Sequence, residues 1–120
     1  MNAINKNDMY REFVMSSLTA DLKANGYAVL TSPSDDVDWI VSKPNVQPFA
    51  VEFRSYKNLR YFLDSPYSKG RRKARVLGKA LPIYCVGVDS DDERIAVDRG
   101  LIRKLGSYAS QLKLKEYVAA

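Results

Sequence analysis

Three charged residues, Asp38, Glu52 and Arg54, have the types and the spacing that could do chemistry. Asp38 begins one apolar run, residues 39–41, and Glu52 and Arg54 follow a second run, residues 49–51. Two prolines mark a turn between the runs, so the runs are expected to pair as a hairpin that brings the two carboxylates together. Two carboxylates make a hard-oxygen site for Mg²⁺ or Mn²⁺, and a nearby cation suits phosphoryl chemistry.

Strand geometry divides the second run between two faces. Residues two apart in a strand point the same way, so Glu52 and Arg54 share one face. Val51 and Phe53 share the other face for the same reason. The acidic and basic side chains are therefore expected side by side, with an apolar surface behind them.

The amino-acid composition excludes several kinds of site. Histidine is absent and Cys85 is the only cysteine, which removes histidine and thiolate zinc sites, Ser-His triads and Cys-His pairs. Any metal must then be held by oxygen, which favours Mg²⁺ or Mn²⁺. Cys85 lies in the apolar run 81–88 and is expected to be a small core residue in a reducing cytoplasm. No apolar run approaches the roughly 18 residues that cross a membrane, and no signal peptide is recognisable.

The chain of 120 residues is expected to form a single domain, residues 1–120, with an ordinary globular composition. Its order of elements predicts an α/β sandwich with a mixed sheet of about five strands flanked by helices. The predicted strands are residues 27–30, 37–42, 49–56, 81–88 and 94–97, and the predicted helices are residues 9–25, 71–79 and 99–117.

Helical spacing of apolar residues supports the first and the last of these helices. In the first helix, Asn7 or Asp8 can cap the start, and Gly26 suits the left-handed position after the end. Its apolar stripe consists of Tyr10, Phe13, Val14, Leu18 and Leu22. The last helix presents Leu101, Ile102, Leu105, Tyr108, Leu112 and Tyr117, which fit either a core face or a dimer interface.

A basic segment lies between the third and fourth predicted strands. Five cations fall within seven residues: Lys69, Arg71, Arg72, Lys73 and Arg75. Four aromatic residues precede them: Tyr56, Tyr61, Phe62 and Tyr67. Either the segment is a solvated loop with aromatics packed beneath it, or it contacts nucleic-acid phosphates and stacks on bases. The net charge of +5 permits a polyanionic partner.

The sequence resembles the PD-(D/E)XK nucleases, and among them the archaeal-type Holliday-junction resolvases. The resemblance is carried by Gly26–Ser34 (GYAVLTSPS), Val37–Val41 (VDWIV) and Ala50–Arg54 (AVEFR), and by the later runs 81–86 and 94–97. These proteins begin with a helix ending in Gly-aromatic, followed by a strand, a Ser-rich loop, an Asp, and a hairpin that carries Glu-x-Lys. The resemblance spans roughly residues 10–105 and implies a restriction-endonuclease-like sandwich.

The resemblance also implies an activity, a cofactor and partners. It implies a structure-selective endonuclease that uses Mg²⁺ or Mn²⁺ to hydrolyse branched or junction DNA as a homodimer. Asp38 and Glu52 match the metal-binding carboxylates, Arg54 stands at the lysine position, and Glu12 is the candidate for the glutamate of the first helix. The DNA-binding candidates are Ser32 and Ser34 of the Ser-bearing loop, together with the cations Lys57, Arg60, Lys69, Arg71, Arg72, Lys73 and Arg75.

Arg54 leaves two interpretations open. An arginine can stabilise charge on a phosphoryl group, but its pKa above 12 prevents it from accepting a proton from water. Alternatively, Arg54 pairs with Glu52 or Asp38 in place of a metal, which fits a non-catalytic nucleic-acid-binding protein on a nuclease fold. A third hypothesis is a protein-binding regulator that reuses the fold. Lys57 and Lys43 are candidate substitutes for the missing lysine.

Overall fold

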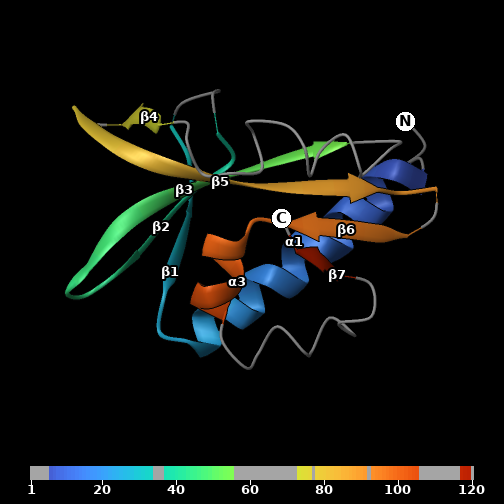
Figure 1. The fold of residues 1–120 in the computed structure, drawn as a ribbon, viewed down its shortest axis with the longest axis horizontal. Helices are drawn as coiled ribbons and strands as arrows, with labels where there is room; N and C mark the ends of the chain where they lie inside the picture. Colours follow the sequence, from blue (N-terminus) through green and yellow to red (C-terminus); the bar gives the residue numbers. More distant parts are fainter. Residues whose placement is uncertain are drawn as a thin grey trace.

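A computed structural model of the chain describes residues 6–33, 37–55, 73–76, 78–91, 93–105 and 117–119. It shows helices packed on a mixed open sheet, which confirms the predicted α/β class (Figure 1). The elements in chain order are α1 (Lys6–Ala24), β1 (Ala28–Thr31), β2 (Trp39–Lys43), β3 (Val46–Ser55), β4 (Lys73–Val76), β5 (Lys79–Asp89), β6 (Arg94–Val97), α3 (Arg99–Leu105) and β7 (Tyr117–Ala119).

The strands lie in the order β1-β2-β3-β5-β6-β7. Strands β1, β2 and β3 form an antiparallel meander, β3 pairs with β5 in parallel, and β5 pairs with β6 antiparallel. These five strands are the predicted ones. Two strands that were not predicted extend the sheet: β7 pairs with β6 in parallel, and β4 pairs with the first residues of β5.

Helix α1 forms and ends where its sequence requires. Val14, Leu18 and Leu22 recur at helical spacing and are buried, as predicted. Gly26 follows the helix with φ +87°, and the Tyr27 N–H donates to the Leu22 carbonyl at 3.0 Å, which closes the helix end. The predicted stripe is wrong at Phe13, whose side chain is exposed.

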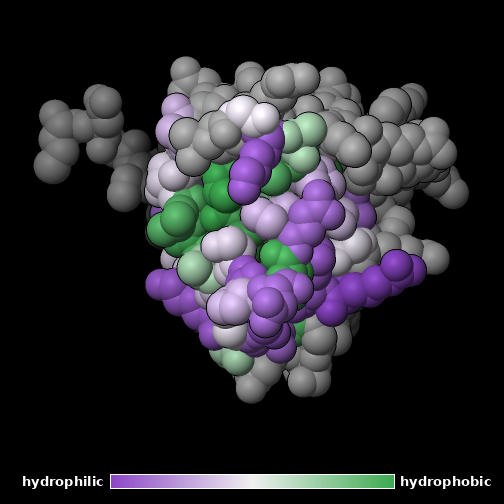
Figure 2. All heavy atoms as spheres, turned by 90° about the vertical axis from the view of Figure 1, so that its left-hand side faces the viewer, coloured by the Kyte–Doolittle hydropathy of each residue, from purple (hydrophilic) through white to green (hydrophobic). Residues whose placement is uncertain are grey.

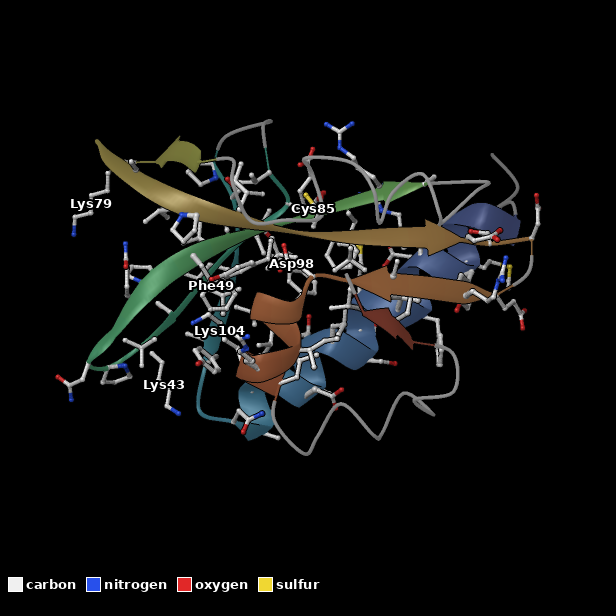
Figure 3. The ribbon with its side chains drawn as sticks, viewed as in Figure 1. Lys43, Phe49, Lys79, Cys85, Asp98 and Lys104 are labelled. Atoms are coloured by element: carbon white, nitrogen blue, oxygen red, sulfur yellow. The ribbon has the colours of Figure 1, made fainter. Side chains whose placement is uncertain are left out.

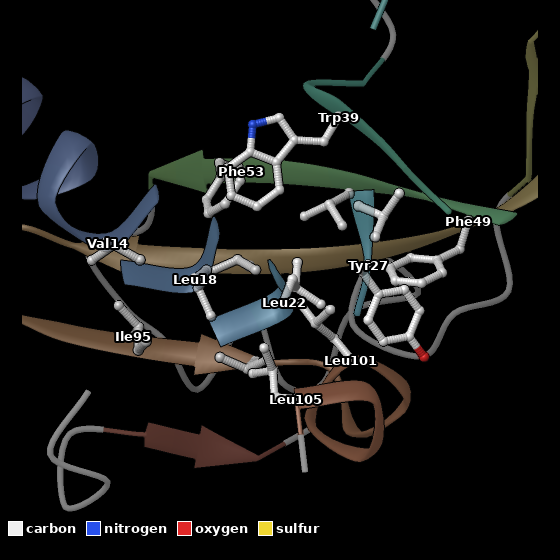
Figure 4. Packing of buried hydrophobic residues seen from close by; sticks show 14 of the residues in the cluster. Val14, Leu18, Leu22, Tyr27, Trp39, Phe49, Phe53, Ile95, Leu101 and Leu105 are labelled. Carbon is white, nitrogen blue, oxygen red and sulfur yellow. The ribbon is translucent and has the colours of Figure 1, made fainter. Parts of the chain in front are cut away.

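Both helices pack on the same face of the sheet. Side chains of α1 and α3 form one buried cluster with the strand residues that point toward them, and Figure 4 shows Leu18, Leu101 and Leu105 meeting over the strands. Trp39 and Phe53 meet edge to face with ring centroids 4.7 Å apart, which fixes the β2–β3 pairing on this side. The core thus lies behind Val51 and Phe53, as the strand alternation predicted.

Strand β5 is buried on both faces, as its continuous apolar run predicted. Val86 and Val88 face the helices, while Ile83 and Cys85 are buried on the opposite face. The reason is its place between β3 and β6 inside the sheet. Cys85 is a buried free thiol, so the prediction of a small core residue is confirmed.

Two predicted helices are wrong in whole or in part. Residues 73–76 form strand β4, because Gly78 at φ +78° turns the chain back and Val76 pairs with Lys79. The cross-strand pairing that follows the turn outweighs the local helix propensity of this segment. Helix α3 ends at Leu105, before Gly106 in the sequence, and Tyr117 begins β7 instead of ending a helix. Tyr108 and Leu112 lie outside the described residues.

The surface at the end of the sheet where the β2–β3 hairpin turns mixes hydrophilic and hydrophobic residues (Figure 2). Among the helices in the described ranges, neither is long and apolar enough to cross a membrane.

Candidate functional site

Asp38 lies directly before β2, beside the middle of β3. Trp39 pairs with Val51, and the Asp38 N–H also donates to the Val51 carbonyl at 2.9 Å, so the pairing is shifted by one residue at Asp38. Asp38 therefore lies against Val51, the residue before Glu52. A metal ion shared by the two carboxylates stays a prediction.

The Asp38 carboxylate ends the ladder between the two strands. Its Oδ2 accepts a hydrogen bond from the Phe53 N–H at 2.7 Å. This side-chain contact lies just before β2, which begins at Trp39. Its Oδ1 accepts a hydrogen bond from the Arg11 guanidinium at 3.1 Å. The Asp38 side chain is 28 % exposed, so the site opens to solvent here.

The Glu52 carboxylate is held more tightly and is more deeply buried. Its Oε1 accepts from Arg54 Nε at 2.9 Å and lies 2.8 Å from a terminal nitrogen of the same guanidinium. Its Oε2 accepts the Cys85 thiol at 3.5 Å, across the β3–β5 pairing that places these residues side by side. Only 10 % of the Glu52 side chain is exposed, and the Arg54 guanidinium compensates its charge.

Arg11 is a site residue that the sequence interpretation missed. It lies three residues before Val14 and thus extends the buried stripe of α1 toward the start of the helix. When a charged residue continues an apolar stripe of a helix, its position predicts an oppositely charged partner at the edge of the core. Its neighbour Glu12, the predicted helix glutamate, is exposed, and α1 reaches Asp38 through Arg11.

The two arginines reach the carboxylates from different sides of β3. Arg11 comes from α1, in the layer that covers Val51 and Phe53. Arg54 lies on the strand face shared with Glu52 and pairs with it there, as one of the two interpretations of Arg54 predicted. The end of the hairpin therefore holds two carboxylates and two guanidiniums, with no formal excess of either charge.

Lys43 does not replace the missing lysine. It lies at the far end of β2 from Asp38, about 16 Å away at ordinary strand rise. Its ammonium lies 5.1 Å from the centre of the Tyr27 ring, and Figure 3 shows it near the hairpin turn and away from Cys85. Lys104 makes a similar contact, 4.8 Å from the centre of the Phe49 ring.

The predicted DNA-binding residues fall mainly outside the described ranges. The half-buried Ser32 lies beside the site, since its N–H donates to the Asp38 carbonyl at 2.9 Å. Lys73 and Arg75 belong to β4. The predictions for Ser34, Lys57, Arg60, Lys69, Arg71 and Arg72, and for the aromatic residues Tyr56, Tyr61, Phe62 and Tyr67, lie outside the described residues.

Asp38 and Glu52 carry the oxygen donors that a hard divalent cation prefers. All four of their carboxylate oxygens have a hydrogen-bond or ion-pair contact within the protein. Arg11 contacts Asp38 from the helix side of β3, whereas Cys85 contacts Glu52 on the other face. Within the described ranges, no group of three or more His, Cys, Asp or Glu side chains is placed to hold a metal.

Two other buried carboxylates lie away from the hairpin. Asp98 caps α3, because its Oδ1 accepts the Gly100 N–H at 2.9 Å. Asp21 is buried on α1, and its Oδ2 has no hydrogen-bond partner in the part of the chain that the structure describes. Burial raises the pKa of Asp21 above its ordinary value.

Burial also raises the pKa of Tyr84, with smaller contributions from Asp98 and Tyr27 that are opposed by Arg103. Tyr84 is a β5 residue whose ring lies against Phe49 and α3.

Comparison of the chain with protein-family models, with curated proteins and with solved structures gave no match.

Proposed function

We propose that this protein is a metal-dependent, structure-selective DNA endonuclease similar to the Holliday-junction resolvases, with Asp38 and Glu52 as its metal-binding residues. The observation that carries the proposal is that the β2–β3 hairpin brings Asp38 against Val51, next to Glu52, with a guanidinium on each carboxylate. Two guanidiniums lie within 3.1 Å of them, so groups that can hold a cation and groups that can hold a phosphate occur together.

The order of elements supports the same proposal. A helix followed by Gly26 precedes a short strand, an Asp-led strand, a Glu-bearing strand, a buried strand and a short strand. That is the order which the sequence resemblance implies. The finer assignment of a restriction-endonuclease-like sandwich is part of this proposal.

Each residue has a defined chemical task in this proposal. Asp38 and Glu52 would hold Mg²⁺ or Mn²⁺, which supplies Lewis-acid catalysis of phosphodiester hydrolysis. Arg54 would stabilise negative charge on the phosphoryl group, since it stays protonated and cannot act as the base. The Phe53 N–H and the Cys85 thiol keep the two carboxylates oriented.

The test is cleavage of a labelled four-way DNA junction by the purified chain, in Mg²⁺, in Mn²⁺ and in EDTA. We expect cutting with either metal, none in EDTA, and a loss of at least about 100-fold in Asp38→Asn and in Glu52→Gln. Glu93→Gln, an exposed acidic residue in a turn, is the matched control and should cut normally. Absence of cutting in both metals, or full activity of Asp38→Asn, contradicts the proposal.

A second candidate is favoured by the ion pairs themselves. Both carboxylates are already neutralised by guanidiniums, as expected of a nucleic-acid-binding protein that has lost its metal site. This candidate predicts salt-sensitive binding of the junction without turnover in either metal. Equal binding at low and high salt would count against it.

The remaining partner predictions belong to the first candidate. Two paired cuts in a four-way junction require two sites, which a twofold homodimer supplies. Sedimentation equilibrium of the chain with and without junction DNA measures this directly. A monomer that stays monomeric on the junction would remove the homodimer from the proposal.

A further inference from the structure

Helix α1 carries a second stripe of side chains, opposite the one that it buries. Val14, Leu18 and Leu22 face the core (Figure 4). On the other side of the helix, four residues follow one another at intervals of four, three and four positions, and all of them are exposed: Met9, Phe13, Ser16 and Ala20. At about 100° per residue, these four point within roughly 60° of one another. Intervals of four and three are typical of the seam between two packed helices.

The first half of this exposed stripe is a patch of large apolar side chains. Met9 is 61 % exposed and Phe13 is 59 % exposed. The ring of Tyr10 lies next to that of Phe13, with 6.2 Å between the ring centroids. A hollow of about 450 Å³ opens here, lined by these three residues and Glu93. Adjoining apolar side chains at the surface mark a place where another surface packs.

The stripe changes in size and in charge along the helix. Its second half consists of the small residues Ser16, Ala20 and Ala24, all exposed. Glu12 and Lys23 are exposed on one flank of the stripe, near its start and near its end, and neither has an ion-pair partner in the part of the chain that the structure describes. A surface that is large and acidic at one end and small and basic at the other is complementary to its own reverse.

We propose that α1 pairs antiparallel with α1 of a second copy of this chain, about a twofold axis next to Ser16. In this register Phe13 packs over Ala20 of the partner subunit, and Glu12 faces Lys23 of the partner subunit. The symmetry makes each of these contacts twice. A parallel pair would instead place Phe13 against Phe13 of the partner subunit and leave both charges unmatched.

The inference does not depend on the proposed function, because it uses only the surface of α1. It supplies the contact surface for the homodimer which that function requires. An interface made by one helix from each copy is small, so we expect a reversible dimer with a dissociation constant on the order of 100 µM.

The first experiment is sedimentation equilibrium of the full chain without DNA. We expect Phe13→Ser to raise the dissociation constant of the dimer by at least about 10-fold, because the apolar contact is lost twice. Leu30→Ser is the matched control. Leu30 is 60 % exposed, but it lies on β1 and outside the stripe, so this variant should associate as the wild type does.

The second experiment reverses charges and tests the antiparallel direction. Glu12→Lys and Lys23→Glu should each weaken self-association by about 10-fold, because like charges then face each other twice. An equal mixture of the two variants should associate as tightly as the wild type, since every contact between the unlike copies joins opposite charges. Lys79→Glu, at an exposed position at the start of β5, is the control and should associate normally alone.

Weakening by Phe13→Ser together with recovery in the mixture supports the interface. A wild type that is still monomeric at about 1 mM overturns it. A Phe13→Ser variant that dimerises like the wild type also overturns it, as does a mixture that recovers nothing. The junction-cutting assay reports on the proposed function separately: cutting by a chain that does not associate through α1 removes this interface alone, and a dimer through α1 that does not cut removes the proposed function alone.

Discussion

Glu52 shows how a single side chain serves both the fold and the candidate site. Its carboxylate lies almost out of solvent between β3 and β5 and receives Arg54 and Cys85. Removing one partner of such a pair costs more than removing both, because the remaining charge keeps its desolvation penalty.

We therefore predict that Arg54→Met lowers the free energy of unfolding by about 1–3 kcal/mol, a range reduced from that of a fully buried pair because Arg54 is partly exposed. Glu52→Gln/Arg54→Met should recover most of this loss. Urea unfolding of the two single variants and the double variant gives the coupling. A double variant as unstable as the sum of the single variants would show that the pair does not stabilise the fold.

Asp21 gives a pH-dependent prediction. Burial raises the pKa of its carboxyl, so the folded chain binds this proton more tightly than the unfolded chain does. Its contribution to stability is present below the ordinary pKa of 3.8 and is lost as the pH rises through the raised value in the folded state. Asp21→Asn should thus be more stable than the wild type at neutral pH, by on the order of 1 kcal/mol.

This advantage of Asp21→Asn should disappear as the pH falls below the ordinary value of 3.8. Thermal unfolding of both proteins across this range is the measurement. Asp91→Asn, at an exposed turn position, is the control and should follow the wild type at every pH. An advantage that is the same at all pH values would mean that the charge is not its source.

At the residue scale, the sequence predicted the pairing of Arg54 with Glu52, because residues two apart in a strand share a face. It did not predict Arg11 or the Cys85 contact. These two contacts depend on how α1 and β5 pack against β3, which are long-range events. Glu12 was a candidate only through the family resemblance. The helix face that meets Asp38 is set by Val14 and Leu18, and Arg11 continues it.

Among the elements, the short helix α3 shows how closely one segment can fit its neighbour. A Cβ on Gly100 would lie 2.3 Å from a ring carbon of Tyr84, which is itself packed against Phe49. The sequence offered no sign of this constraint, because it arises only where α3 crosses β5.

We predict that Gly100→Ala destabilises the protein. The gain in helix propensity is about 1 kcal/mol, and overpacking against Tyr84 costs about 1–3 kcal/mol, so the net loss should be near 1 kcal/mol. Chemical denaturation measures it. Adding Tyr84→Leu to Gly100→Ala should remove the clash, and failure of that rescue would locate the loss elsewhere.

The strands that have a clear local sequence pattern were predicted correctly. The errors concern segments whose secondary structure depends on pairing with a distant part of the sheet. Strands β2 and β3 each contain a short apolar run, and β5 is almost continuously apolar. Strand β4 carries cations that suit a helix equally well, and its turn at Gly78 and its pairing with β5 make it a strand. The early end of α3 has a local sign in Gly106, a helix-weakening residue that the predicted helix ran through.

On the scale of the whole molecule, the charge of +5 is the property that bears on a polyanionic partner. We predict that replacing Arg71, Arg72 and Lys73 by glutamine weakens junction binding. The plot of the logarithm of the binding constant against the logarithm of the salt concentration should become less steep, by up to about 2.7 for duplex contacts. Fluorescence anisotropy at several salt concentrations measures this slope.

A triple variant with the same loss of charge is the control: Lys23→Gln, Lys43→Gln and Lys104→Gln. Lys43 and Lys104 lie over aromatic rings away from Asp38, so this variant should keep most of the slope. Equal effects of the two triple variants would show that net charge matters and that the basic segment has no special part.

The position of Glu52 between two different strand pairings also has a consequence for how the protein folds. The β2–β3 hairpin joins residues close in sequence and can form within microseconds, whereas Glu52 and Cys85 are 33 residues apart and meet only through the parallel β3–β5 pairing. A chain that has formed only the hairpin can make the hydrogen bond from the Phe53 N–H to Asp38, but the Cys85 thiol is not yet beside Glu52. The contacts of Glu52 are therefore completed by the slowest kind of contact in the sheet, and a partly folded chain has only the neighbouring Arg54 to orient this carboxylate.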